Sequence, residues 1–353
     1  MSTAAPHRPV GESLALARPA GRRAVGLSLA LVVGLGLLVV LALVSVGVGA
    51  RHVPIADAWA ALTSYDPASF DHEAVRARVP RTVLALVVGV ALGLAGALMQ
   101  GMTRNPLADP GILGVNAGAS AAVVVAIMVL GITAPAGYVW FAFAGAAGAA
   151  VVVYAVAAAG REGATPIKLA LAGACVSAAL TSLVTAILVT GTDVLDTFRF
   201  WQVGAVGGRG FETFLPILPF LAVGAAIALA SGRALNALSL GDDVARGLGQ
   251  DVRRSRLVVG CAVVLLCGGA TAAAGPIAFV GLTVAHVARA ITGPDNRWVL
   301  PFSGVLGAAL VVLSDVLGRV VAQPGQLQVG IVTATVGAPV FIALVRRRRL
   351  AEL

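Results

Sequence analysis

The sequence predicts an all-α integral membrane protein with about ten transmembrane helices. Of its 353 residues, 59% are hydrophobic and only 12% are charged, and the mean hydropathy of +0.95 lies far outside the range of soluble domains. Apolar stretches of the ~20 residues that a spanning helix needs recur along nearly the whole chain. They leave no interval long enough for a separate soluble domain.

Each apolar stretch gives one expected span. The first follows Arg22 and Arg23 and exceeds the apolar region of a signal peptide in length, so we interpret it as an uncleaved helix. The expected spans are 24–48, 82–100, 114–131, 137–158, 167–190, 213–231, 256–275, 277–292, 300–318 and 329–345. Residues 1–23 and 346–353 are then tails on either side of one transmembrane domain, 24–345.

The 43 glycines suit helices that pack closely in lipid. Small residues let helix backbones approach where no hydrophobic drive brings helices together. Gly89 with Gly93, and Gly114 with Gly118, therefore predict tight helix contacts. The alternative is that glycine simply accumulates in a chain rich in alanine, glycine and valine.

The basic residues indicate the orientation of the chain. With ten spans both termini lie on the same side, and only seven of the 25 Lys and Arg residues fall on the opposite side. Because basic residues favour the cytoplasmic side, we expect both termini in the cytoplasm. The net charge of +9 is mostly this orientation signal. No basic patch interleaved with aromatic residues indicates nucleic-acid binding, so lipid is the expected surrounding.

Two segments between spans are more organised than simple connectors. Residues 51–80 include Trp59, Tyr65 and Phe70, and we expect them on the outer side as an interfacial helix. Residues 233–256 are amphipathic and cytoplasmic, and glycines divide them into two short helices. Such a knob would dock a cytoplasmic partner. The alternative is an amphipathic loop that rests on the lipid headgroups.

The sequence contains no motif for binding a nucleotide or a metal ion, or for hydrolysis. A nucleotide-binding P-loop needs a lysine followed by serine or threonine, but the only lysine, Lys168, precedes Leu169. The three cysteines lie in apolar stretches without the spacing of metal ligands, so no metal site is expected. Hydrolytic motifs are missing as well, and the chain is therefore not expected to be an enzyme.

Ion-coupled carriers hold acidic or histidine side chains near the middle of a span. In this sequence all sixteen acidic residues are expected in loops, tails or span ends. His286 and Asp315 come closest to burial, and each has an arginine three or four residues later, Arg289 and Arg319. Local pairing on one helix face is expected to satisfy both.

Four stretches carry a resemblance to one family. They are "RVPRTVLALVVGVALGLAGALMQGMTRNPLADPGILGVNAGA" at 78–119, "LSLGDDVARGLG" in the knob, "AGPIAFVGLTVAHVAR" at 274–289 and "QLQVGIVTATVGAPVFIALV" in the last span. From about Arg22 onward, the chain resembles the FecCD-type permeases, which are the membrane subunits of ABC importers for iron siderophores, haem and cobalamin.

The resemblance implies a ten-helix permease of the bacterial inner membrane, paired with a second copy or a close paralogue. Substrate would pass between the two permeases. Two cytoplasmic subunits would bind and hydrolyse ATP, so this chain itself would hold no cofactor. A periplasmic or lipid-anchored binding protein would deliver the substrate. Ferric siderophore is favoured because it is the commonest assignment in the family, with cobalamin or haem as the alternative. The competing hypothesis from another class is a gradient-driven secondary carrier.

The resemblance also assigns roles to residues. Acidic lobes of the binding protein would dock on the outer arginines Arg78, Arg81 and Arg319, whose alternative role is to anchor headgroup phosphates. The ATPase would couple through Leu240, Gly241, Asp242, Ala245, Leu248 and Gly249. The cytoplasmic mouth would be shaped by a turn of Asn105, Pro106, Asp109, Pro110 and Gly111, although these residues form turns in any context. Further motif positions are Gly275, Pro276, Gly281, His286 and Arg289.

Two departures from the family pattern concern helix geometry. Ala285 stands where the family usually has proline before the residue that matches His286, and Gln328 stands where proline commonly precedes the last span. We expect a softened bend at the first of these positions, because proline is what kinks a helix.

Overall fold

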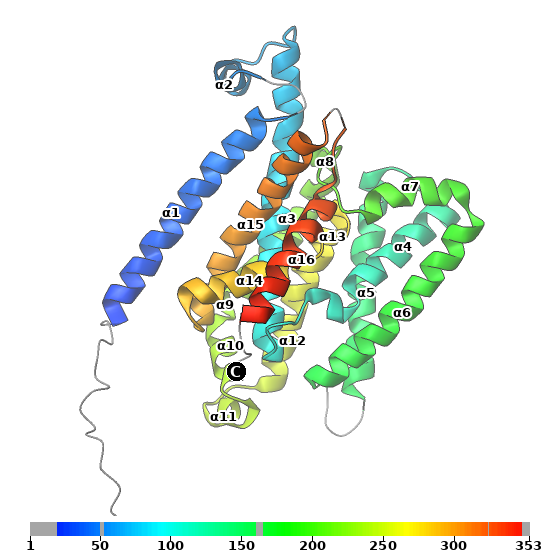
Figure 1. Ribbon diagram of the computed structural model, residues 1–353. Helices are drawn as coiled ribbons and strands as arrows, with labels where there is room; N and C mark the ends of the chain where they lie inside the picture. The colour runs from blue at the N-terminus through cyan, green and yellow to red at the C-terminus, as the bar shows by residue number, and fades with distance from the viewer. Residues whose placement is uncertain (1–19, 50–52, 160–164, 324, 348–353) are drawn as a thin grey trace, which may run out of the picture.

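The computed structural model describes residues 20–49, 53–159, 165–323 and 325–347, and every regular element in this part of the chain is a helix (Figure 1). Seven helical segments are long and apolar enough to cross a membrane, namely α1 (Ala20–Gly47), α3 (Phe70–Thr103), α5 (Pro135–Ala158), α6 (Pro166–Thr190), Phe211–Ala230, Val252–Ala274 and α15 (Asn296–Val321). Three shorter apolar helices are α4 (Val115–Leu130), α14 (Val280–Thr292) and α16 (Val329–Arg347). Each expected span overlaps one of these ten segments, and the count of ten spans stays a prediction.

Two of the seven long segments are composite, and four short helices connect the rest. Phe211–Ala230 consists of α8 (Phe211–Phe214), η2 (Leu215–Ile217) and α9 (Leu218–Ala230). Val252–Ala274 consists of α12 (Val252–Val263), a π-helical turn η3 (Val264–Gly268) and α13 (Gly269–Ala274). The connecting helices are α2 (Ile55–Thr63), α7 (Thr192–Gln202), α10 (Gly232–Ser239) and α11 (Asp242–Gly247).

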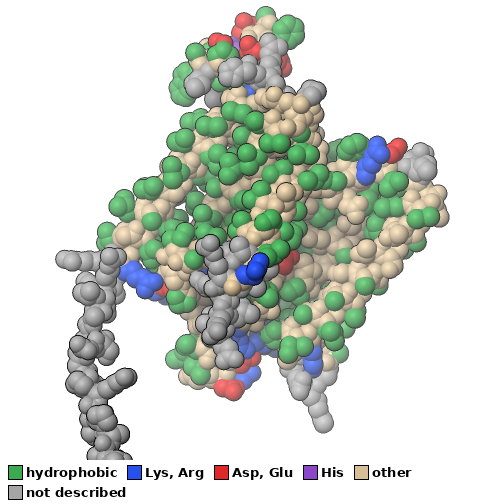
Figure 2. Space-filling model, viewed as in Figure 1, with side chains coloured by type: hydrophobic (Ala, Val, Ile, Leu, Met, Phe, Trp, Pro, Cys, Tyr) green, Lys and Arg blue, Asp and Glu red, His purple; other side chains and the backbone are tan. Residues whose placement is uncertain are grey.

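The two ends of the bundle are distinct. In Figure 1, α2 lies at the upper end beside the start of α3, while α10 and α11 lie at the lower end. The beginning of α1 and the end of α16 both lie toward the α11 end, the arrangement expected when the termini share one side. Figure 2 shows hydrophobic side chains over much of the visible face, with charged side chains gathered toward both ends. The tails 1–19 and 348–353 lie outside the described residues.

Helix α3 is the central element, and it begins earlier than expected. Its 34 residues start at Phe70, twelve positions before the expected span start at 82. The Ser69 side chain accepts a hydrogen bond from the His72 backbone N–H, and Asp71 and Glu73 in the first turn suit the positive end of the helix dipole. The helix therefore begins in a polar turn and continues through Pro80, where the sequence pattern wrongly placed a boundary.

The expected interfacial helix is therefore confined to α2. Trp59 on this helix is 63% exposed, while Ala58 and Ala61 pack in a small apolar cluster with Val75 of α3. The remainder of the segment, from Phe70 onward, belongs to α3 and does not lie across the end of the bundle.

Glycines let the backbone of α3 come into direct contact with the backbones of neighbouring helices. A Cβ atom on Gly89 would lie 2.5 Å from the Cα atom of Ala308 in α15, and one on Gly93 would overlap the Ser303 carbonyl. Gly118 meets the Gly145 carbonyl of α5 in the same way, so three of the four named glycines make the expected contacts. Gly114 does not, because its φ of +72° closes the short helix η1 (Pro110–Leu113) ahead of α4.

Two non-helical connections lead into the bundle. Residues 104–109 connect α3 to η1, and residues 275–279 connect α13 to α14. Gly275, at φ +78°, lies against the Trp201 carbonyl, and the neighbouring Ala274 carbonyl accepts a hydrogen bond from Ala205 N–H at 2.7 Å. Non-helical backbone at membrane depth is tolerated only where protein satisfies its polar groups, which these contacts help to do.

Replacing Gly89 by alanine tests the close approach of α3 and α15. The added methyl group would force two backbones apart, and overpacking of this kind costs about 1–3 kcal/mol. We expect a lower thermal midpoint for Gly89→Ala in detergent, measured by size-exclusion chromatography after heating. The matched control is Gly36→Ala on α1, where an added Cβ meets nothing within 4 Å. Equal midpoints for the two variants would contradict the assigned packing.

Candidate functional site

Two of the three outer arginines pair with one buried carboxylate at the α2 end of the bundle, and the third, Arg78, binds the nearby end of α1. Arg81 Nη2 lies 2.7 Å from Asp315 Oδ1, and Arg319 Nη2 lies 3.0 Å from Asp315 Oδ2. The Asp315 side chain is fully buried, and that of Arg319 is 2% exposed. We call Arg78, Arg81, Asp315 and Arg319 the Asp315 cluster. The expected pairing of Asp315 with Arg319 is confirmed, and the second arginine, Arg81 from α3, comes from a contact that sequence spacing does not reveal.

The Asp315 cluster also holds the end of α1. Arg319 Nη1 donates to the carbonyls of Ser45 and Val48 at 2.8 and 2.6 Å, and Arg78 Nη1 donates to that of Gly47 at 2.8 Å. The last carbonyls of a helix carry its negative dipole end and have no partners within the helix. Two guanidinium groups therefore close α1, which is otherwise largely exposed.

The three arginines are unequally placed for the expected docking role. Arg78 is half-buried, Arg81 has a 12% exposed side chain, and the Arg319 guanidinium is directed into the protein. In this arrangement Arg319 supports the cluster from inside and presents no surface to a partner. Docking on the outer arginines stays a prediction, and Arg78 and Arg81 are both more accessible than Arg319.

The opposite end carries the knob formed by α10 and α11. Its two short helices are joined at Gly241, whose φ of +104° suits only glycine, and the chain leaves α11 at Gly249, with φ +81°. Ala245 is buried against the bundle, while Leu240 and Leu248 are 61% and 62% exposed. The expected two-helix knob is confirmed as a structural element. Its docking role stays a prediction.

Polar contacts fasten the knob to the bundle at two points. The Asp242 carboxylate lies 3.2 Å from Arg104 Nη2, at the end of α3, and 3.0 Å from Arg256 Nη2 on α12. On α10, Asn236 Nδ2 donates to Asp295 Oδ1 at 2.6 Å, just before α15. Hydrogen bonds from Arg297 and Asn236 lower the pKa of Asp295 to about 2, so this carboxylate stays charged throughout the physiological range. The knob is thus joined to α3, α12 and α15.

The turn at 105–111 has the expected local chemistry and leads from the knob end of α3 toward the interior. Asn105 Oδ1 accepts from Leu107 N–H, and Asp109 Oδ1 accepts from Gly111 N–H, so both side chains stabilise turns. Asp109 and Pro110 then line a small interior cavity beside Leu92, which lies eleven residues, or about 16 Å, before the end of α3.

The turn starts at the knob end of α3 and leads back into the bundle, and its role at a cytoplasmic mouth stays a prediction. Asp109 is a loop residue by sequence, but the fold carries its carboxylate into the interior. Asn116 also lines this cavity and accepts a hydrogen bond from Thr271 Oγ1 at 2.9 Å, a polar pair that the sequence patterns missed.

The remaining motif residues position α14. The Cα of Gly96 on α3 would lie 2.9 Å from a Cβ on Gly281, and Pro276 lies in the break before α14. Arg289 Nη1 donates to Gln100 Oε1, and Gln100 Nε2 donates to the Leu282 carbonyl. The arginine thus binds across to α3, and its expected local pairing with His286 stays a prediction.

The two departures from the family pattern leave the helices intact. Helix α14 runs without a break through Ala285, which is fully buried. The Gln328 carbonyl accepts from the N–H groups of Ile331 and Val332, so this residue stands at the start of α16.

In the part of the chain that the structure describes, no group of three His, Cys, Asp or Glu residues could hold a metal ion.

Together these features define a class of protein. A bundle of apolar helices with a fastened knob at one end, and without a nucleotide-binding loop in its sequence, has the architecture of a multi-pass membrane permease. The chain belongs to the FecCD transport family, whose model matches residues 37–347. The family expected from the sequence is therefore confirmed.

Relatives and a solved structure extend over most of the chain. It is 46% identical over 270 residues to the Probable siderophore transport system permease protein YfiZ of Bacillus subtilis (strain 168), covering 76% of this chain and 81% of the relative. It is 43% identical over 312 residues to the Ferric enterobactin transport system permease protein FepD of Escherichia coli (strain K12), covering 88% and 93%. A structure described as an inward-facing conformation of a metal-chelate type ABC transporter aligns with a TM-score of 0.78 at 27% identity, covering 93% and 99%.

Substituting Asp315 tests the electrostatic role of the Asp315 cluster. In Asp315→Asn two arginines lose their shared buried counter-charge, and breaking a buried pair costs about 3–5 kcal/mol. The thermal midpoint of the purified chain is expected to fall markedly. Asp196→Asn is the matched control, because this 67% exposed aspartate pairs with Arg199 at the surface, where such pairs contribute about 0.2–1 kcal/mol. A similar small effect of both substitutions would refute a structural role for Asp315.

Proposed function

We propose that this chain is the permease subunit of an ABC importer for iron chelates, with a ferric siderophore as cargo. The main observation behind this proposal is the knob. It presents exposed apolar side chains at one end of a membrane bundle while polar contacts fasten it to α3, α12 and α15. A chain with such a docking element and no nucleotide-binding loop of its own fits transport driven by partner ATPases. The permeases YfiZ and FepD support siderophore and ferric enterobactin as the cargo class.

The complete importer would contain two permeases, two ATPases and a binding protein. In this arrangement the knob and both termini face the cytoplasm of a bacterium, and α2 faces the outside of its inner membrane. The excess of basic residues on the knob side supports this orientation. A second copy or paralogue would complete the path, and the binding protein would deliver substrate at the α2 end.

The mechanism we infer is mechanical. Closure of the ATPases on ATP would push the knob, and Asp242 would pass that movement to α3 through Arg104 and to α12 through Arg256. Helix α3 packs against α15 and α14 at backbone distance, so these helices would shift with it as a unit. Rigid-body rocking of this kind converts a local push into alternate openings of a path. The chain itself would make or break no covalent bond.

Replacing Leu248 tests the docking surface. Leu248→Arg removes a 62% exposed apolar contact and introduces a charge that an apolar interface would have to desolvate. We expect at least a tenfold loss of ATPase co-purification and of radioactive ferric-siderophore uptake, with unchanged membrane insertion. Leu248→Met keeps the apolar contact and is expected to behave like the unaltered chain. Normal uptake with Leu248→Arg would mean that the knob only rests on the membrane.

Replacing Asp242 separates transmission from docking. In Asp242→Asn the knob keeps its apolar surface but loses both ion pairs, so the ATPases should still co-purify while uptake per ATP hydrolysed falls. The measurement compares ATPase activity with uptake in the same proteoliposomes. Asp243→Asn is the matched control, since that neighbour is 98% exposed and pairs with Arg246 on its own short helix. Unchanged coupling in Asp242→Asn would exclude this route.

Reversing the charge of Arg78 tests delivery at the α2 end. If an acidic lobe docks there, Arg78→Glu should weaken binding of the cognate binding protein more than Arg78→Ala, because reversal adds repulsion. The loss should shrink as salt rises, since screening acts over ~8 Å at 0.15 M ionic strength. Binding is measured in nanodiscs, with the surface residue Arg199→Glu as control. Rescue by a Glu→Arg change on one lobe would identify the contact, and equal binding by all variants would reject Arg78 as a docking residue.

A further inference from the structure

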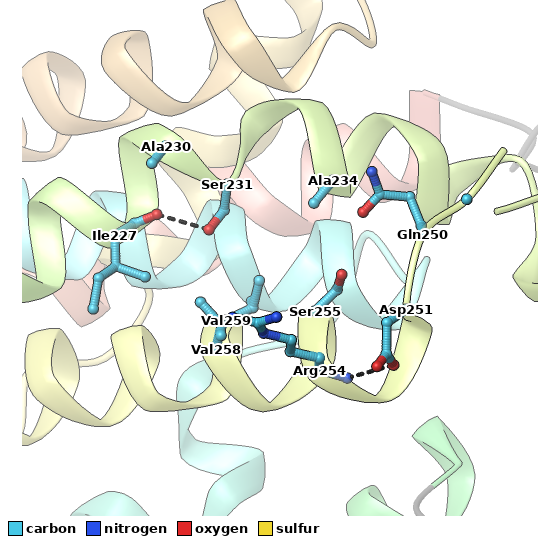
Figure 3. Close-up of a pocket in the computed structure, with 11 residues that line it drawn as sticks. Ile227, Ala230, Ser231, Ala234, Gln250, Asp251, Arg254, Ser255, Val258 and Val259 are labelled. Carbon is cyan, nitrogen blue, oxygen red and sulfur yellow. Dashed lines mark hydrogen bonds between the residues drawn. The ribbon is translucent and has the colours of Figure 1, made fainter. Parts of the chain in front are cut away.

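A groove of about 550 Å³ runs between α9 and α10 on one side and α12 on the other (Figure 3). Its size falls within the ~300–1,000 Å³ of ordinary ligand sites. The lining residues are Ile227, Ala230, Ser231, Ala234, Gly249, Gln250, Asp251, Arg254, Ser255, Val258 and Val259. None of them belongs to the Asp315 cluster, to the interior cavity or to the exposed apolar surface of the knob.

The groove is polar at one end and apolar at the other. Gln250 and Asp251 lie where the chain leaves the knob and enters α12, and Arg254 follows one turn later. Ile227 and Val258 lie farther along α9 and α12, within segments apolar enough to cross a membrane. In Figure 3 the Arg254 side chain extends along α12 toward Val258, so its charged group lies between the two regions.

The polar end has a positive charge available for a ligand. Asp251 Oδ1 accepts from the Arg254 backbone N–H and so caps the start of α12. The Arg254 guanidinium makes no hydrogen bond or ion pair with any described residue, whereas Arg256 pairs with Asp242. The Ser231 hydroxyl in the groove lining donates to the Ile227 carbonyl one turn earlier, so it already has a hydrogen-bond partner.

We propose that this groove binds one anionic phospholipid from the leaflet on the knob side. The phosphate would lie at Arg254 with Gln250 and Ser255 beside it, and an acyl chain would lie against Ile227 and Val258. Basic pockets between helices at the inner membrane surface suit anionic headgroups. The proposal does not depend on the cargo, and it rests on the proposed orientation only for naming the leaflet as cytoplasmic.

A lipid fits the surroundings better than a protein segment. Leu229 and Leu257, which flank the groove on α9 and α12, are 52% and 50% exposed, and Val258 in the lining is 41% exposed. These apolar side chains belong to membrane-spanning segments and would meet acyl chains, so the groove continues a lipid-facing surface. A bound lipid there would also brace α9 and α12 directly above the knob.

The test is a lipid titration of the purified full-length chain in detergent. Phosphatidylglycerol is expected to raise the thermal midpoint saturably, while phosphatidylcholine at the same concentrations has a much smaller effect. A basic side chain near the membrane surface contributes about fivefold in affinity for an anionic headgroup. Arg254→Ala should therefore shift the half-saturating concentration of phosphatidylglycerol about fivefold upward. The matched control, Arg253→Ala, removes an equal charge from the next position, outside the groove lining.

The apolar part of the site has its own variant. Ala230→Phe leaves Arg254 in place but fills the groove, and it is expected to abolish saturable stabilisation by phosphatidylglycerol. Native mass spectrometry gives a second readout, in which one retained phosphatidylglycerol per chain should be lost in Arg254→Ala and Ala230→Phe but kept in Arg253→Ala. This count does not depend on how strongly each substitution changes stability.

Four outcomes would overturn the proposal. The first is an equal response to phosphatidylglycerol and phosphatidylcholine. The second is an equal shift of the half-saturating concentration in Arg254→Ala and Arg253→Ala. The third is stabilisation by inorganic phosphate alone, which would indicate an anion site without a lipid. The fourth is loss of ATPase co-purification in Ala230→Phe with an unchanged lipid response, which would assign the groove to the ATPase interface. Loss of uptake with normal lipid binding would count against the permease proposal alone.

Discussion

The close approach of α3 to α15 and α14 is the constraint on which the rest of this structure depends. Lipid offers no hydrophobic drive for helix association, so contact must come from packing at backbone distance. Gly89 and Gly93 face α15, and Gly96 faces α14, all along one stretch of α3. Because the three helices touch through their backbones, their ends are fixed relative to one another. The Asp315 cluster at one end and the Asp242 contacts at the other both depend on α3 standing in that position.

The second constraint is that buried backbone must keep its hydrogen bonds. Two non-helical connections lead into the bundle, and each is held by side chains or by a neighbouring loop. Asp109 supplies a carboxylate to the first, and the Ala274 carbonyl beside the second receives Ala205 N–H. Arg209 Nη1 also donates to the Ala273 carbonyl at 2.6 Å, so one of the seven basic residues expected on the outer side is buried against the end of α13. A count of charges on each side does not predict the depth of a single residue.

Hydropathy located ten apolar segments and the amphipathic pattern located the knob, because side chains that face lipid and side chains that face water differ strongly in polarity. It was insufficient at Pro80, where a capped polar turn keeps α3 helical beyond its apolar stretch. Spacing along one helix paired Asp315 with Arg319, but it could not reveal the contact of Asp315 with Arg81, which lies on another helix. Likewise, local spacing paired His286 with Arg289, whereas packing of α14 on α3 gives Arg289 the amide of Gln100. Contacts between distant segments are set by how helices cross, and a single sequence does not encode that in any local pattern.

The sharing of Asp242 between two arginines has a consequence for how the knob can move. Arg104 and Arg256 belong to different helices, yet both reach the same carboxylate, and neither pair is fully buried. Partly hydrated ion pairs exchange partners at a cost of about 1 kcal/mol or less. The carboxylate can therefore turn from one guanidinium toward the other without ever losing a counter-charge. Such a joint keeps the knob attached to both α3 and α12 even when one of its two ion pairs lengthens.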